Sequence, residues 1–223
     1  MDAPAADPAQ LRRSLSFIRV VNRLLGYTRA TLGHLERFSR TWPRGQTIRI
    51  VDLATGSADV PRAILRWADR HDWDVRIVGV DNHTVTANAA ADEGAPDPRL
   101  TIVQADVFNL PFADATFDYA LCSMFLHHLD DDGAAAMLAT MSRLARRGII
   151  CADLLRHRRA YAWITCFTVF ANPMVRHDAR VSVLQSFSEP EIMALRDRAG
   201  LTFASFFRHF GHRFVLAGEK RAD

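Results

Sequence analysis

The stretch Ile48–Pro61, with the sequence IRIVDLATGSADVP, decides the fold class of the chain. It opens with a mostly apolar run that predicts a buried strand over Ile48–Leu53, close to whose end stands the acid Asp52. Small residues fill the turn Ala54–Ala58, and apolar positions then recur at helical spacing from Val60. A strand, a turn of small residues and a helix allow backbone N–H groups to approach a ligand closely. An ordinary strand–helix connection has the same order of elements. The segments that follow therefore decide between a ligand-binding turn and an ordinary connection.

The strand–helix order repeats along the chain. Short apolar runs rich in valine and isoleucine predict strands at Ile48–Leu53, Val75–Asp81, Leu100–Gln104, Phe117–Ser123 and Gly148–Asp153. Helices are expected at Val60–Asp72, His83–Asp92 and Asp131–Arg146. Repeated units of this kind predict an α/β fold with a doubly wound, mostly parallel sheet.

The end of the chain departs from this repeat. Ser188-x-x-Glu191 forms a capping box that predicts the start of a helix ending at Gly200. Two further apolar runs, Thr202–Arg208 and Arg213–Ala217, predict a β-hairpin. The sheet is therefore expected to have seven strands and to close with an antiparallel terminal hairpin.

The composition narrows the class of protein. With 223 residues, of which 49% are hydrophobic, the chain can build a real core. The net charge is only +3 and Lys220 is the only lysine, which gives no nucleic-acid signal. The three cysteines have no pairing or metal spacing, which favours a reducing cytoplasm. No apolar run reaches the roughly 18–20 residues of a spanning helix, so no stable membrane insertion is expected.

Polar residues follow the ends of the predicted strands. Ligands of open parallel sheets bind beyond the carboxyl ends of the strands, so these residues are candidates for a site. Asp81, followed by Asn82, could accept hydrogen bonds from both hydroxyls of a ribose. Asp106 could accept one from the amino group of a purine, and Ser123 ends the fourth strand. Each acid could instead cap a helix or pair with a base. Three acids, Asp52, Asp81 and Asp106, at matching positions in successive units nevertheless favour a ligand site.

The order VDLATGSADVP, VGVD and VQADVFNLPFADATFDYALCSMFLHHL resembles the class I S-adenosylmethionine-dependent methyltransferases over Ile48–Asp153. The reversed last strand of that family agrees with the predicted hairpin, and the resemblance implies a Rossmann-like fold. Ala54 and Ala58 replace two of the family's three usual glycines, and Gly56 remains. Alanine does not adopt a positive φ at low cost, so the path of the turn is left open.

The resemblance also implies roles for single residues. Asp52 would order the loop, and the methionine part of S-adenosylmethionine would lie over Ala54, Thr55 and Gly56. Asp81 would hold the ribose, while Asp106 and the amide of Val107 would hold the adenine. The predicted cofactor-binding set is Asp52, Ala54, Thr55, Gly56, Asp81, Asn82, Asp106, Val107 and Ser123.

We expect a single methyltransferase domain with additions around the cofactor-binding core 48–153. Residues 1–8 are expected to be a tail, and residues 9–40 an amphipathic helix pair whose second helix covers Thr28–Ser39. This pair could form a helical lid over the site or simply pack on the core. The aromatic stretch 154–187 is expected to be a helical insertion on the substrate side, and 188–223 to hold the last helix and hairpin.

Three histidines are candidates for catalysis. His127 and His128 follow the fourth strand, and His177 lies in the aromatic insertion. Histidine suits the role of a base at neutral pH, which a hydroxyl acceptor would need. Asp130, Asp131 and Asp132 stand where acids favour the start of the next helix, so no metal site is predicted.

The residues after the fourth strand read CSMF, not the Asn/Asp-Pro-Pro-aromatic signature of amide and adenine methyltransferases in this superfamily. An aromatic, apolar insertion suits a planar or hydrophobic small molecule. The resulting prediction is O-methylation of an aromatic, phenolic or polyketide-like acceptor in secondary metabolism. The alternatives are C-methylation, a degenerate cofactor-binding partner subunit and, less favoured, a nicotinamide oxidoreductase. The chain is expected to be a monomer or a homodimer.

Overall fold

The structure is a computed structural model that describes residues 27–82, 97–169 and 173–221. The predicted tail, the first helix of the predicted lid and the predicted helix His83–Asp92 lie outside these residues.

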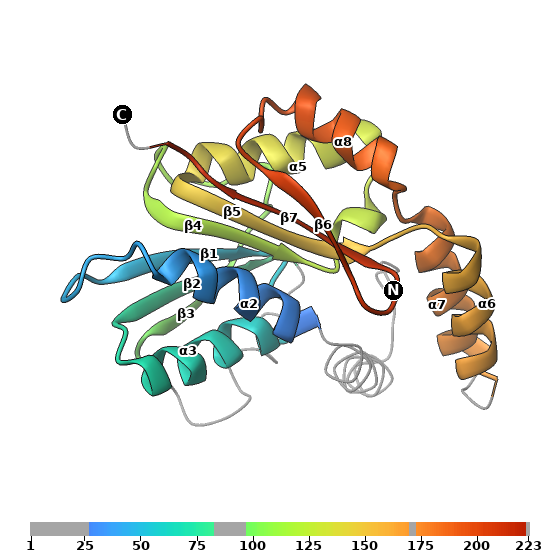
Figure 1. Cartoon of the computed structure of the whole chain (residues 1–223), viewed down its shortest axis with the longest axis horizontal. Coiled ribbons are helices and arrows are strands. Elements are labelled where there is room, and N and C mark those ends of the chain that lie inside the picture. The colour runs from blue at the N-terminus through green and yellow to red at the C-terminus, as the bar shows by residue number, and fades with distance from the viewer. Residues whose placement is uncertain (1–26, 83–96, 170–172, 222–223) are drawn as a thin grey trace.

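One seven-stranded sheet runs through the molecule in the order β3-β2-β1-β4-β5-β7-β6 (Figure 1). The first five strands are parallel to one another, whereas β7 is antiparallel to both β5 and β6. The prediction of a mostly parallel sheet with an antiparallel terminal hairpin is confirmed. The strands are β1 (Ile48–Leu53), β2 (Val75–Asp81), β3 (Leu100–Gln104), β4 (Phe117–Ser123), β5 (Ala145–Leu154), β6 (Ser205–His209) and β7 (Arg213–Glu219).

Helices cover both faces of the sheet, as expected for a doubly wound fold (Figure 1). α2 (Tyr27–Ser39) and α3 (Asp59–His71) lie on one face. α5 (Asp131–Leu144) and α8 (Glu189–Arg198) lie on the other. The capping box of α8 is present, because the N–H and the hydroxyl of Ser188 both donate to Glu191 at 2.7 Å.

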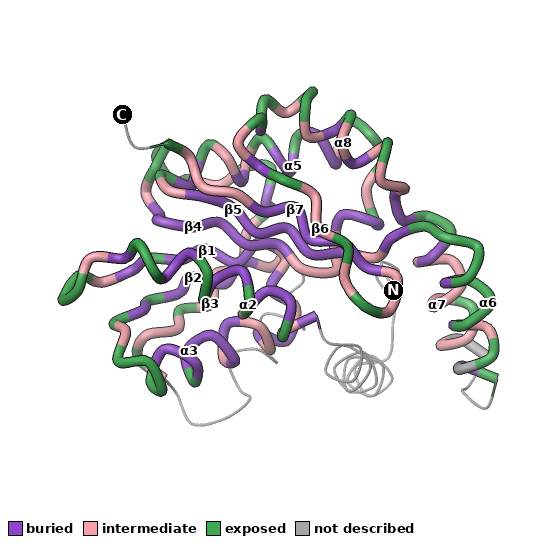
Figure 2. Tube along the Cα trace, viewed as in Figure 1, coloured by how far each residue is buried: buried purple, intermediate pink, exposed green. Residues whose placement is uncertain are grey.

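The central strands form the core, because apolar side chains point to both faces of a covered parallel sheet. β1, β4, β5 and β7 are buried along most of their length (Figure 2). Ile50, Tyr119 and Val215 pack toward α2 and α3, whereas Val51, Cys122 and Phe214 pack toward α5 and α8. This core fixes the carboxyl edge of the sheet, where the candidate site lies.

Several predicted element boundaries were wrong. The helix expected to reach Arg146 ends at Leu144, and β5 begins at Ala145 because Ala145 pairs with Phe117 of β4 and Arg146 ion-pairs with Asp118 at 2.8 Å. The first hairpin strand also begins later than expected, because its main-chain pairing with β7 runs from Ser205 to His209. β7 begins at Arg213 as predicted but extends to Glu219.

The predicted insertion after the fifth strand consists of two helices, α6 (Arg158–Phe167) and α7 (Pro173–Gln185), which pack on each other. Leu155 and Phe187 form a parallel bridge that brings the two ends of the insertion together. α7 contacts the short 3-10 helix η1 (Leu126–His128), which follows β4. The insertion therefore stands beside the carboxyl ends of β4 and β5.

The second helix of the predicted lid is α2, which packs lengthwise against α3, β5 and β7. Its buried face includes Tyr27, Leu35 and Phe38. These contacts are those of a helix packed on the core, and only the start of α2 lies near the carboxyl edge (Figure 1).

Candidate active site

The turn after β1 follows a path that glycine would adopt most easily. Ala54, Gly56 and Ala58 all have positive φ, at 55°, 56° and 57°. Alanine in this left-handed region costs roughly 1–2 kcal/mol, so the turn stores strain at two positions. The path left open by the sequence is therefore the left-handed one, despite the two alanines. An added Cβ on Gly56 would meet no atom within 4 Å, so the backbone at Gly56 is approachable.

Asp52 ties the turn to the end of β1. The Thr55 hydroxyl donates to Oδ2 of Asp52 at 2.6 Å, and the N–H of Thr55 donates to the carbonyl oxygen of Val80 at 2.9 Å. Asp52 is 2% exposed, and this burial raises its pKa to about 7 against the opposing effect of the Thr55 hydrogen bond; nearby Asp81 raises it further. Oδ1 of Asp52 is buried with no hydrogen-bond partner in the described part of the chain.

Asp81 ends β2 and contacts the same turn. Its Oδ2 accepts the N–H of Gly56 at 2.9 Å, which leaves the turn facing the end of β2. Asn82 is exposed, and its carbonyl oxygen accepts from Gln104 at 3.5 Å. The ends of β1, β2 and β3 thus form one continuous rim.

Asp106 lies beyond β3 in a tight turn. Its Oδ1 accepts the N–H of Phe108 at 3.0 Å, and its own side chain is exposed. Val107 is 5% exposed and packs into the core, which anchors the turn. The N–H of Ala105 donates to the carbonyl oxygen of Asp81 at 3.1 Å and holds this turn beside β2.

A buried histidine–carboxylate pair lies at the ends of β4 and β5. Nδ1 of His127 lies 2.6 Å from Oδ1 of Asp153, and the two side chains are 4% and 1% exposed. Asp153 also accepts the backbone N–H groups of His127 and Leu154, at 3.2 and 2.6 Å. A carboxylate only accepts, so Nδ1 must carry the proton and Nε2 of a neutral ring is left as the basic nitrogen.

The other two candidate histidines are placed differently. His128 is exposed and its ring centroid lies 4.2 Å from that of His127. His177 is exposed on α7 and lies on the insertion that contacts η1. Neither is buried as His127 is. Asp130 caps α5 by accepting the N–H of Gly133 at 2.8 Å, as the acids after β4 were expected to do.

Buried polar atoms without partners gather near the carboxyl edge. Within the described residues they include Oδ1 of Asp52, the hydroxyl of Ser123 and the hydroxyl of Tyr27. Buried polar groups in native proteins are nearly always hydrogen-bonded, so such a cluster is typical of a ligand site. Together with the approachable Gly56 and the carboxylates of Asp81 and Asp106, it fits a ligand with an amino acid, a ribose and a purine.

Two residues of this edge were not singled out as candidates from the sequence. Arg213 begins β7 and Tyr27 begins α2, and the guanidinium carbon lies 3.7 Å from the Tyr27 ring centroid. The sequence carried no signal for them, because one reads as a strand residue and the other as part of an amphipathic helix. Asp153 was noted as a strand end, but its pairing with His127 depends on the order of the sheet.

Comparison with known proteins agrees with this geometry. Residues 50–148 match the family model described as a methyltransferase domain. The chain is 32% identical over 114 residues to an O-methyltransferase of Aspergillus nomiae. This alignment covers 50% of this chain and 48% of that protein. It is also 32% identical over 120 residues to a 2-phytyl-1,4-naphtoquinone methyltransferase of Nostoc punctiforme, covering 52% and 50%. The chain therefore spans about half the length of these curated relatives.

The fold has counterparts among solved structures. The plantazolicin methyltransferase BpumL, crystallised with a triazolic desmethylPZN analogue and S-adenosylhomocysteine, superposes with a TM-score of 0.70 at 12% identity, covering 94% of this chain and 91% of that one. Residues 50–148 are therefore similar to a methyltransferase domain, and the chain has the fold of solved methyltransferases.

Two further findings concern the described residues alone. None of their helices is both long and apolar enough to cross a membrane. No three of their histidine, cysteine or acidic side chains are grouped so as to hold a metal ion.

Proposed function

We propose that this protein transfers a methyl group from S-adenosylmethionine to a hydroxyl of a small aromatic, phenolic or polyketide-like acceptor. The observation that carries the proposal is the buried His127–Asp153 pair, which lies at the carboxyl ends of β4 and β5, where β4 is the neighbour of β1 in the sheet. A base held in one tautomer beside a cofactor loop is what a hydroxyl acceptor requires.

The cofactor-binding core is proposed to be 48–153. Asp52 and Thr55 would hold the turn over which the methionine part lies, and Ser123 would contact the same end of the cofactor. Asp81 would hold the ribose, since the two oxygens of a carboxylate suit the two hydroxyls of a ribose. Asp106 and the amide of Val107 would hold the adenine. When bound, S-adenosylmethionine supplies a methyl group on a positively charged sulfur for in-line displacement.

The residues of this chain would then bind, orient and deprotonate the acceptor. Nε2 of His127 would take the hydroxyl proton, while Asp153 keeps the ring oriented and stabilises the imidazolium that forms. The insertion 154–187 would form the acceptor side, because α7 contacts η1, which carries His127. His128 and His177 are proposed as acceptor contacts and not as the base, because both are exposed.

The relatives support an aromatic acceptor without fixing the methylated atom. One is named an O-methyltransferase and another a methyltransferase of a naphthoquinone. C-methylation of a similar acceptor is the second candidate. A cofactor-binding subunit without turnover is the third, and the left-handed turn with its Asp52 and Asp81 contacts argues against loss of the cofactor site.

The test is turnover with S-adenosylmethionine carrying a deuterated methyl group. Purified protein is incubated with phenols, hydroquinones and naphthoquinols, and products are assigned by mass spectrometry and NMR. Labelled methyl ethers in the wild type, lost in His127→Gln, support the proposal. Labelled carbon–methyl products would establish the second candidate, and cofactor binding with no product across the panel would favour the third.

A further inference from the structure

Arg213 is a buried cation without a counter-charge. The residue is 2% exposed, and Nε and both terminal nitrogens of its guanidinium have no hydrogen-bond partner in the described part of the chain. No described acid forms an ion pair with it. An unpaired buried charge is strongly unfavourable, so its presence calls for a partner that these residues do not supply.

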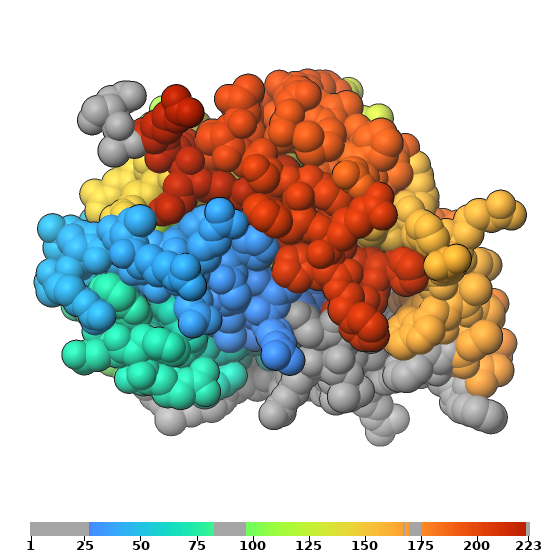
Figure 3. Space-filling view, viewed as in Figure 1, coloured from blue at the N-terminus to red at the C-terminus, as the bar shows by residue number. Residues whose placement is uncertain are grey.

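The position of Arg213 places it at the acceptor side of the site. It pairs with Leu154 of β5, one residue beyond Asp153, and with His209 of β6. Val215 and Ala217, which alternate with it along β7, pack against α2, so its side chain lies on the α2 face. Figure 3 shows the β6–β7 hairpin between α2 and α6 on the viewed face.

Among the described residues, the surroundings of Arg213 offer a neutral hydroxyl and no available carboxylate. The hydroxyl of Tyr27, whose ring lies against the guanidinium, is also buried without a partner among the described residues. Burial raises the pKa of Tyr27 above its ordinary value, so this hydroxyl is protonated at neutral pH. The carboxylate of Asp153 is already bonded to His127 and to the N–H of Leu154. The group that is missing must therefore accept hydrogen bonds.

We propose that Arg213 and Tyr27 bind a carboxylate carried by the aromatic methyl acceptor. A planar guanidinium matches a carboxylate with two parallel hydrogen bonds, and the Tyr27 hydroxyl adds a third donor. This inference rests on the proposed function, and it names the acceptor as an aromatic acid.

The carboxylate of the cofactor is the competing ligand. β4 and β5 lie between β1, which leads into the cofactor turn, and β7, which begins with Arg213. Three strand spacings of roughly 4.8 Å each therefore separate these two places by about 14 Å. Asp153, which holds His127, lies by contrast on the neighbouring strand β5. The sheet order therefore favours the acceptor.

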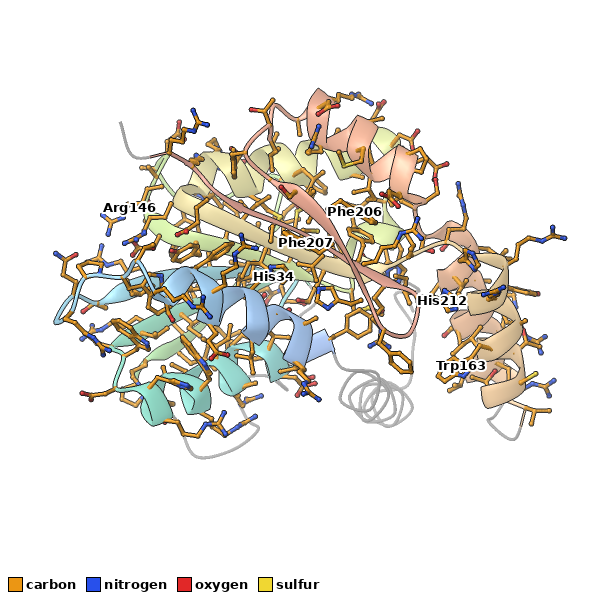
Figure 4. The ribbon with its side chains drawn as sticks, in the orientation of Figure 1. His34, Arg146, Trp163, Phe206, Phe207 and His212 are labelled. Carbon is orange, nitrogen blue, oxygen red and sulfur yellow. The ribbon has the colours of Figure 1, made fainter. Side chains whose placement is uncertain are left out.

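Figure 4 labels residues of the β6–β7 hairpin, which carries Arg213, and of the helices beside it. His34 of α2 faces Phe207 of β6, with ring centroids 4.6 Å apart, and its Nε2 lies 3.2 Å from that of His209. At the turn of the hairpin, His212 stacks on His157, which precedes α6, with ring centroids 4.9 Å apart. Both α2 and the insertion are thus joined to the strand that carries Arg213.

The experiment compares carboxylates with their neutral amides. Hydroxybenzoates and hydroxynaphthoates, and the matching primary amides, are titrated calorimetrically into protein saturated with S-adenosylhomocysteine. We expect at least one acid to bind the wild type about tenfold or more tightly than its amide, and Arg213→Gln to abolish this preference. Affinity for S-adenosylhomocysteine should stay within about twofold in Arg213→Gln.

Stability separates a binding role from a structural one. Without ligand, Arg213→Gln should melt at the same or a higher temperature than the wild type, because it removes an unpaired buried charge. Arg213→Lys should keep the charge but lose most of the preference for the acid, since it lacks the planar fork. Arg66→Gln on α3, where the arginine is exposed, controls for net charge.

Three results would overturn the inference. They are a wild type with no preference for any acid over its amide, an Arg213→Gln protein that keeps the preference, and an Arg213→Gln protein that loses S-adenosylhomocysteine binding. Failure of the wild type to bind S-adenosylhomocysteine would instead count against the proposed function. In that case the same titrations in the free protein still decide on Arg213.

Discussion

The backbone N–H of Gly56 donates to Oδ2 of Asp81, with 2.9 Å between nitrogen and oxygen. The bond joins the turn after β1 to the end of the neighbouring strand β2. It also fixes the direction of the Asp81 carboxylate before any ligand arrives. Preorganisation of this kind reduces the entropy lost on ligand binding. This gain in affinity is set against the strain of the two left-handed alanines in the turn.

Replacing Ala54 by glycine should stabilise the protein slightly. Glycine relieves roughly 1–2 kcal/mol of left-handed strain but adds about 0.4–1 kcal/mol of unfolded-state entropy. The net gain of about 0.5–1 kcal/mol should raise the melting temperature by about 1–4 °C. Ala136→Gly on the exposed face of α5 is the control and should destabilise by about 1 kcal/mol. Equal losses in both variants would show that Ala54 is not strained.

The pH dependence of stability should reveal Asp52. Its pKa is about 7 in the folded protein, above the ordinary value of 3.8. Stability from this group is therefore fully present below about pH 4 and is lost as the pH rises through about 7. Asp52→Asn keeps an oxygen for Thr55 but cannot ionise.

At pH 8 without cofactor, Asp52→Asn should be more stable than the wild type by on the order of 2–4 kcal/mol at most. At pH 5 Asp52 is neutral in the folded protein but ionised in the unfolded chain, so the difference should fall to about 1–2 kcal/mol at most. Thermal melts from pH 5 to 8.5 measure this difference. A difference that does not change with pH would mean that Asp52 does not titrate in this range.

The His127–Asp153 pair should control kcat more than cofactor affinity. His127→Gln removes the proposed base, and Asp153→Asn removes the acceptor that keeps the proton on Nδ1. Each should lower kcat by roughly 10²–10⁴-fold, with the Kd for S-adenosylmethionine changed less than about threefold. His128→Gln and His177→Gln should mainly raise the KM for the acceptor. A larger kcat loss in either of these two would move the base to that histidine.

The parallel core could be predicted from the sequence because its signals are local. β1, β2, β3 and β4 have the predicted bounds, since each is a short apolar run covered on both faces. The start of β5 could not be predicted, because Arg146 reads as a helical residue until its contact with Asp118 is known. Pairing across the sheet decided that boundary.

Part of the candidate site could likewise be predicted from the sequence, and part depends on contacts between distant segments. Asp52, Asp81 and Asp106 could be singled out as candidates because they stand at or just after the ends of strands. The His127–Asp153 pair joins residues 26 positions apart, and Arg213 meets Tyr27 only through the packing of α2 on β7. Long-range contacts of this kind leave no periodic signal in a single sequence. The left-handed φ of Ala54 likewise opposes its local preference.

The most direct test of the cofactor site is calorimetric titration with S-adenosylmethionine and S-adenosylhomocysteine. The wild type, Asp81→Ala and Asp81→Asn are compared, since the asparagine side chain keeps an oxygen that can accept the N–H of Gly56. We expect micromolar binding to the wild type, loss of about 100-fold or more in Asp81→Ala, and a smaller loss in Asp81→Asn. No binding of either ligand to the wild type, or equal binding to all three proteins, would contradict the assignment of this site.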